Sequence, residues 1–224
     1  MREAGMACYR VGLATALMLV TSCLAQERGG GDPGAAWPLI GSVLKDAQVS
    51  GSLEYWGRCG SGMWRPDFPK MIRPLSESSG SPLEVLQRSF ANDPKMRVMQ
   101  EPGGMIRMVE TDVPSDLLDV RISHVSFHLP VSAGMYGPNY ALGPIFSTPE
   151  VKAFIAAKHI ESLISFQPGG GAGIKRVYGE LDNVTVSQAL DYVLKIFPGF
   201  WVYENCPAKD GSSRAVYVAF FESF

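Results

Sequence analysis

Three histidines are the residues of this chain best suited to general acid–base chemistry or metal binding. His124 and His128 lie four residues apart within 120–129, where alternating apolar and polar residues predict a β-strand. In a strand this spacing puts both side chains on one face but roughly 13 Å apart, too far to share one metal ion. His159 falls near the end of a predicted helix, where the helix dipole accounts for it. The spacing therefore predicts neither a metal site nor a histidine-based catalytic site.

Other motifs of catalysis and cofactor binding are also missing. The glycine-rich segment 169–175 lacks the Gly-Lys-Ser/Thr ending of a phosphate-binding loop, so we interpret it as a mobile connection. Asp112, Asp116 and Asp119 are spread through a predicted turn and are interpreted as a solvated acidic loop. We therefore expect no catalytic residue, no cofactor and no metal ligand. One alternative stays open, a secreted hydrolase in which His124 meets an aspartate or glutamate within hydrogen-bond reach.

Four cysteines bear on redox chemistry. Cys8 and Cys23 fall in or beside a predicted export signal, which leaves Cys59 and Cys206. An even pair in an oxidising compartment favours a disulfide, and closing so long a loop would stabilise the fold by roughly 4–5 kcal/mol before strain is subtracted. The alternative is a pair of buried thiols.

The first 25 or so residues have the parts of a secretory signal. Arg2 and Arg10 supply the positive region, and the apolar run 11–20 is too short to span a bilayer of roughly 30 Å. Small residues follow, and Val20–Cys23 also resembles a bacterial lipobox, in which Cys23 would be lipidated. We expect a chain that is exported to the periplasm, associated with the outer membrane or secreted, with no transmembrane span in its mature part. Residues 26–36 are predicted to be a flexible tether.

The charge of the chain argues against one class of partner. Its 20 basic and 22 acidic residues nearly balance, and no segment concentrates positive charge. Because phosphate backbones demand such a concentration, we expect no nucleic-acid partner.

The elements that would position any site follow from an internal repeat. Residues 81–101 and 185–205 align with little identity but with one pattern. Each copy opens with a capping box, continues as an amphipathic helix, and reaches a proline that ends it. The aligned pairs are Pro94 with Pro198, Leu86 with Leu190, Phe90 with Leu194, Met96 with Phe200 and Val98 with Val202.

After each helix come two segments in which residue types alternate with the period of a β-strand, separated by a glycine-rich turn. This pattern predicts two hairpins. A strand is also predicted before each helix, at 52–56 and 175–178. The fold class is therefore α+β, with two related β-α-β-β units at 37–119 and 166–224. The middle segment, 120–165, is predicted to contain a strand, a Gly/Pro-rich loop and a helix from 149 to 160, with a loop after it.

The approach to the second helix resembles a known family. Asn183, Val184, Thr185, Ala189, Leu190 and Leu194 match the pattern of the short N-terminal domains of secretins and TonB-dependent receptors. The resemblance covers about 175–224 and, more loosely, 52–110. It implies a non-catalytic periplasmic module that makes protein contacts. The chain lacks the barrel, plug and pore-forming regions of the larger family members, so only the module is implied.

Aromatic residues crowd the predicted last hairpin. Because a strand turns alternate side chains to opposite faces, one set must be core and the other can form a partner surface. Trp201, Tyr203 and Tyr217 are the candidate partner residues; the alternative is that all of them belong to the core. The leading hypothesis is an envelope protein-interaction module that binds a partner through an aromatic patch or an exposed sheet edge. A purely structural envelope role is the remaining alternative.

Overall fold

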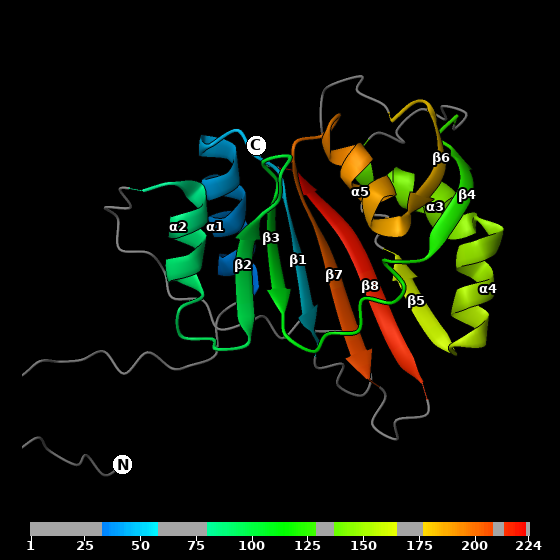
Figure 1. Ribbon diagram of the computed structural model, residues 1–224, viewed down its shortest axis with the longest axis horizontal. Coiled ribbons are helices and arrows are strands. Elements are labelled where there is room, and N and C mark those ends of the chain that lie inside the picture. Colours follow the sequence, from blue (N-terminus) through cyan, green and yellow to red (C-terminus); the bar gives the residue numbers. More distant parts are fainter. Residues whose placement is uncertain (1–32, 58–79, 129–136, 165–176, 208–212, 223–224) are drawn as a thin grey trace, which may run out of the picture.

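The computed structural model describes residues 33–57, 80–128, 137–164, 177–207 and 213–222. Over these ranges the protein is an α+β fold with a six-stranded mixed sheet in the order β2-β3-β1-β7-β8-β5 and a two-stranded sheet, β4-β6 (Figure 1). The strands are β1 (Gly51–Trp56), β2 (Met96–Gln100), β3 (Ile106–Glu110), β4 (Arg121–Ser126), β5 (Ile160–Ile164), β6 (Glu180–Thr185), β7 (Gly199–Pro207) and β8 (Arg214–Glu222). The helices are α1 (Pro33–Asp46), α2 (Pro82–Ser89), α3 (Leu142–Ser147), α4 (Pro149–Ala157) and α5 (Val186–Leu194), with a 3-10 turn, η1 (Pro138–Ala141).

The capped helix and the hairpin of the predicted repeat are found in both copies. Helices α2 and α5 each begin with a complete capping box, formed by Ser81 with Glu84 and by Thr185 with Gln188. Each helix leads into an antiparallel hairpin, β2-β3 or β7-β8. In each copy a further strand, β1 or β5, pairs in parallel with the last strand of the hairpin. The first unit is therefore β1-α2-β2-β3, and the second contains β5-α5-β7-β8.

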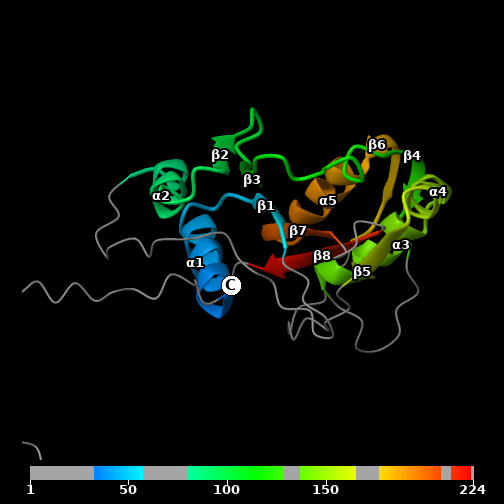
Figure 2. The same ribbon diagram turned by 90° about the horizontal axis from the view of Figure 1, so that it is seen from below.

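The two units join into one sheet, and the second is turned over relative to the first. Strand β1 pairs in parallel with β7, so the hairpin of the second unit runs opposite to the hairpin of the first. The strands follow the same order across the sheet in both units but run in opposite directions. The two units are therefore related by a half turn about an axis that lies in the sheet, perpendicular to the strands. As a result α1 and α2 lie on one side of the sheet, while α5, α3, α4 and the β4-β6 pair lie on the other (Figure 2).

Two details of the predicted repeat are wrong. The strand before α5 begins at Glu180 and pairs with β4, so the strand of the second unit that corresponds to β1 is β5, which the sequence did not indicate. The alignment also slips by one residue after the helix. Met96 packs under α2, its own helix, whereas Phe200 packs on the α1 side of the sheet and Trp201 takes the equivalent place near α5. A one-residue slip exchanges the faces of every strand side chain.

The start of the fold also differs from the prediction. Helix α1 covers part of the predicted tether and was not expected from the sequence. Pro33 stands in its first turn, and Ile40 and Leu44 are fully buried against the sheet. The ring of Trp37 meets that of Phe221 with centroids 3.7 Å apart. The helix predicted for 149–160 is confirmed as α4, although it ends at Ala157.

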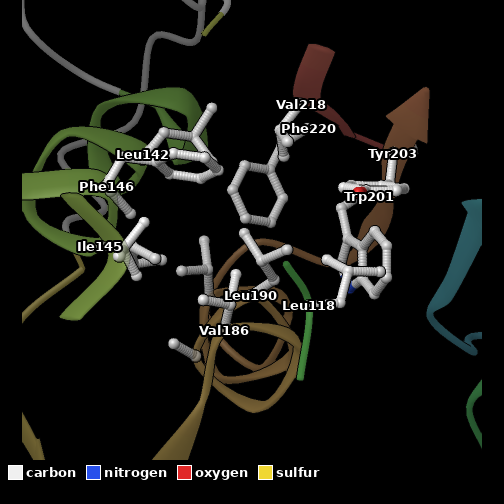
Figure 3. Packing of buried hydrophobic residues seen from close by; sticks show 14 of the residues in the cluster. Leu118, Leu142, Ile145, Phe146, Val186, Leu190, Trp201, Tyr203, Val218 and Phe220 are labelled. Carbon is white, nitrogen blue, oxygen red and sulfur yellow. The ribbon is translucent and has the colours of Figure 1, made fainter. Parts of the chain in front are cut away.

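Each side of the sheet has its own core. Under α1 and α2 lie Leu53, Tyr55, Leu86, Phe90, Ile106, Met108, Phe200 and Val202. The larger core, between α5, α3, η1 and the sheet, includes Leu118, Leu142, Ile145, Phe146, Val186, Leu190, Trp201, Tyr203, Val218 and Phe220 (Figure 3). Trp201 and Tyr203 are both 0 % exposed, so the predicted partner surface is wrong for these two residues. They are long inward-facing side chains of a central strand. Tyr217 is half-buried.

Candidate functional site

A polar cluster, which we call the junction cluster, lies where the two units meet: Ser52, Glu54, Glu101, Arg107, Asp191 and Trp201. Arg107 of β3 is its centre. Its guanidinium donates to Asp191 Oδ2 of α5 at 2.5 Å and to Glu101 Oε1 at 2.9 Å. A third nitrogen donates to Ser52 Oγ at 3.1 Å. The arginine thus joins both units in one network.

Trp201 completes the setting of Asp191. The indole N–H donates to Asp191 Oδ1 at 2.8 Å, and the Arg107 guanidinium lies 5.1 Å from the Trp201 ring centroid. Stacking a guanidinium over an indole is a favourable cation–π contact. Each carboxylate oxygen of Asp191 therefore accepts a hydrogen bond from a different residue. These two bonds hold the Asp191 side chain of α5 in place over β3 and β7.

Glu54 is the perturbed acid of the junction cluster. It lies on β1 opposite Val109 and Tyr203 and is 8 % exposed. Burial raises the pKa of Glu54 to about 7, because the ionised carboxylate loses its hydration; Arg107 opposes this shift, while Asp119, Asp191 and Glu101 add to it. A carboxyl group that titrates near neutrality makes this junction sensitive to pH.

A second group of polar residues covers the outer side of the β4-β6 pair. His124 Nδ1 lies 2.7 Å from Asp182 Oδ1, directly across the two strands. Both side chains are exposed, at 52 % and 77 %. The hydrogen bond to Asp182 raises the pKa of His124. The condition set by the hydrolase alternative, a carboxylate within reach of His124, is therefore met.

The neighbouring His128 does not form a catalytic relay. Ser126 Oγ lies 2.6 Å from His128 Nδ1, and Glu180 Oε1 lies 3.6 Å from the same nitrogen. A serine–histidine–acid triad needs the serine on one ring nitrogen and the acid on the other. Tyr178, 68 % exposed, meets the His128 ring edge-on with centroids 4.4 Å apart. Within the described residues, no group of three or more His, Cys, Asp or Glu side chains is placed to hold a metal ion.

The third feature is the outer edge of the sheet at β2. The N–H of Thr111 donates to Lys95 O, and the N–H of Glu101 donates to Met105 O, so the odd-numbered residues of β2 face β3. The backbone groups of Met96, Val98 and Gln100 therefore point away from the sheet. Asp93 O accepts from the Met96 N–H, and the Gln87 side chain donates to Val98 O at 3.1 Å. Within the described residues, these contacts occupy two outward groups and leave four for an incoming strand.

A hollow of about 420 Å³ accompanies this edge. It lies between the end of α2 and β2 and is lined by Gln87, Phe90, Ala91, Asp93, Pro94, Met96, Arg97 and Val98. On the same strand, Met99 is 46 % exposed, one of the few large apolar side chains that are exposed in the described part of the chain; alternation along the strand turns it to the face opposite Val98. An edge strand beside a hollow and an exposed methionine is a setting in which an extended segment can add to the sheet.

Several predicted site residues fall elsewhere. Cys206 is buried on β7, while Cys59, Cys23 and the glycine-rich segment 169–175 lie outside the described residues. The junction cluster was missed by the sequence analysis. The sequence did contain one indication of it: Arg107 interrupts the apolar residues of a predicted strand. A charged side chain at a buried position needs a partner.

Comparisons with known proteins find no family model, no curated protein and no solved structure that matches the chain. Of the helices in the described part, none has the length and apolar character to cross a membrane.

Proposed function

We propose that the chain is an exported, non-catalytic protein-interaction module of the cell envelope, related to the short N-terminal domains of secretins and TonB-dependent receptors. The export signal predicted from the first 25 or so residues supports the compartment. The order of elements from Glu180 onward, a strand, a capped helix and a hairpin, is the order on which the resemblance was based. Thr185 is the helix cap, and Asn183 has a positive φ of 52° in the turn before it.

The module binds its partner by strand addition at β2. The observation that carries this proposal is that Met96, Val98 and Gln100 direct their backbone groups out of the sheet beside the hollow at α2. Main-chain hydrogen bonds supply affinity in this mode, and pockets beside the edge supply specificity. Trp201 and Tyr203 have no part in it, because both are buried.

A proline substitution at the edge tests the proposal. In Val98→Pro the outward N–H is lost, while the hydrogen bonds to β3, made by the odd-numbered residues, remain. The matched control Val98→Thr keeps both the N–H and the side-chain volume. We expect a partner from an envelope extract to bind the wild type and Val98→Thr but not Val98→Pro.

Hydrogen exchange gives the same test at the level of single amides. Bound partner should slow exchange of the Val98 and Gln100 amides, which face outward, more than that of amides in the β7-β8 hairpin. A partner that binds all three proteins equally, and leaves both edge amides unprotected, would contradict strand addition.

A further inference from the structure

The chain contains one example of the pairing that joins two units. Strand β1, the first strand of unit one, lies in parallel beside β7, the first hairpin strand of unit two, with Gly51 opposite Phe200 and Trp56 opposite Asn205. Each of the two strands is also paired on its other side within its own unit. The contact is therefore an edge-to-edge junction of two complete units.

The same two kinds of edge end the sheet. Strand β2 corresponds to β7, since both follow the capped helix and begin the hairpin. Strand β5 corresponds to β1, since both pair in parallel with the last hairpin strand. One end of the sheet thus carries the edge of β7 type, and the other carries the edge of β1 type.

We propose that β5 of one copy of this chain pairs in parallel with β2 of a second copy, repeating the β1-β7 junction between molecules. This inference rests on the proposed function, because it names the strand that β2 receives. The contact is head-to-tail, so it leaves one edge of each kind at the ends of every assembly. Such contacts generate rings when the rotation closes and open filaments when it does not.

The outward backbone groups of β5 follow from the ladder. Asn205 O accepts from the N–H of Gly57, so the odd-numbered residues of β7 face β1 and the even-numbered ones face β8. The β7-β8 register then turns the even-numbered residues of β8 toward β5. Val216 lies opposite Ser162 and bonds to Glu161 and Leu163, the two neighbours of Ser162 in β5. The N–H and C=O of Ser162 therefore point away from β8.

The edges also match in extent. Both β2 and β5 are 5 residues long. At β2, Asp93 and Gln87 hold two of the outward groups. No other described residue bonds to the N–H groups of Val98 and Gln100 or to the carbonyls of Met96 and Gln100, so these remain for the incoming strand. The equivalent groups of β7, on Trp201, Tyr203 and Asn205, are those directed at β1.

Two single-edge variants test the inference. Val98→Pro blocks the β2 edge, and Ser162→Pro blocks the β5 edge; in both, the N–H that is lost points out of the sheet. The controls Val98→Thr and Ser162→Thr keep their N–H groups. Mass measured by light scattering across a concentration series should rise for the wild type and both controls and stay monomeric for each proline variant. Circular dichroism verifies that the variants fold.

Mixing the two proline variants gives the decisive result. Each keeps one working edge of opposite kind, so the mixture should form a one-to-one dimer and nothing larger. Pairing of β2 with β2 would instead leave Ser162→Pro able to dimerise alone, which would overturn the head-to-tail arrangement. A wild type that stays monomeric at all concentrations would overturn this inference. The binding of a strand from another protein would then still be tested by the extract experiment.

Discussion

Arg107 of β3 and Asp191 of α5 form a salt bridge at 2.5 Å that ties one unit of the repeat to the other. Their side chains are 10 % and 21 % exposed, so the pair is largely removed from water. Removing only one member of such a buried pair destabilises the fold strongly, because the remaining charge stays buried without compensation.

We expect Asp191→Ala to lower the free energy of unfolding by about 3 kcal/mol, since Arg107 and the Trp201 indole N–H both lose their acceptor. Urea denaturation at neutral pH measures the change. The control is Glu101→Gln, whose carboxylate is 43 % exposed and should cost less than about 1 kcal/mol. Equal losses for the two variants would contradict the central role of Asp191.

Glu54 makes stability depend on pH. Its pKa is about 7 in the fold against an ordinary 4.5, so the folded chain holds this proton more tightly than the unfolded chain does. The contribution of the protonated acid is complete below pH 4.5, falls between 4.5 and about 7, and is lost above that. Glu54→Gln should remove this slope and stabilise the protein by up to about 3 kcal/mol at pH 8. Denaturation midpoints at pH 4 and pH 8 measure it.

The matched control for Glu54 is Glu161→Gln. Glu161 is an exposed glutamate of β5, so this variant removes the same charge without changing a buried site. A Glu54→Gln variant that retained the wild-type slope would show that another group titrates in this range.

The two helix caps should be energetically alike, because they begin equivalent helices of the repeat. Ser81→Ala and Thr185→Ala each remove the acceptor of one amide at the helix start, from Glu84 or Gln188, and should each cost about 1 kcal/mol. Thermal or urea unfolding measures both. Ser81→Asp and Thr185→Asp keep an acceptor and serve as controls. A negligible loss at one cap only would contradict their equivalence.

Local signals predicted the repeat well. Capping boxes, Pro94 and Pro198, and the alternation in the hairpins depend on neighbours in the sequence, and the elements formed as expected. The fold class followed from them. The alignment was wrong by one residue after the helix. Trp201 lies 11 positions after Leu190, whereas Met96 lies 10 after Leu86, and no local rule distinguishes Phe200 from Trp201 as the residue that faces α5.

Long-range pairing set the rest. Contacts between residues about 150 positions apart place β1 beside β7 and turn the second unit over relative to the first. Ile160–Ile164 is too short and too mixed in character to be distinguished from the end of a helix, so β5 was missed. The junction cluster was missed for the same reason, since Arg107 and Asp191 meet only when the units join.

The cysteine pair remains a prediction. We expect Cys59 and Cys206 to form a disulfide, because the proposed periplasmic compartment is oxidising and Cys206 is buried. Mature protein unfolded without reductant should show no thiol that reacts with a chromogenic reagent, and two after reduction. Two reactive thiols before reduction would refute the pairing.

His124 should titrate at a higher pH than an ordinary histidine, because its Nδ1 is hydrogen-bonded to the Asp182 carboxylate, which favours the protonated ring. Chemical shifts of the imidazole followed by NMR between pH 5 and pH 9 measure the midpoint. Asp182→Asn should move it downward, since the amide stabilises the cation less than a carboxylate does. Glu150→Gln, which alters a carboxylate bonded to Ser123, is the control and should leave it in place. A midpoint unchanged by Asp182→Asn would show that the pair seen across β4 and β6 does not persist in solution.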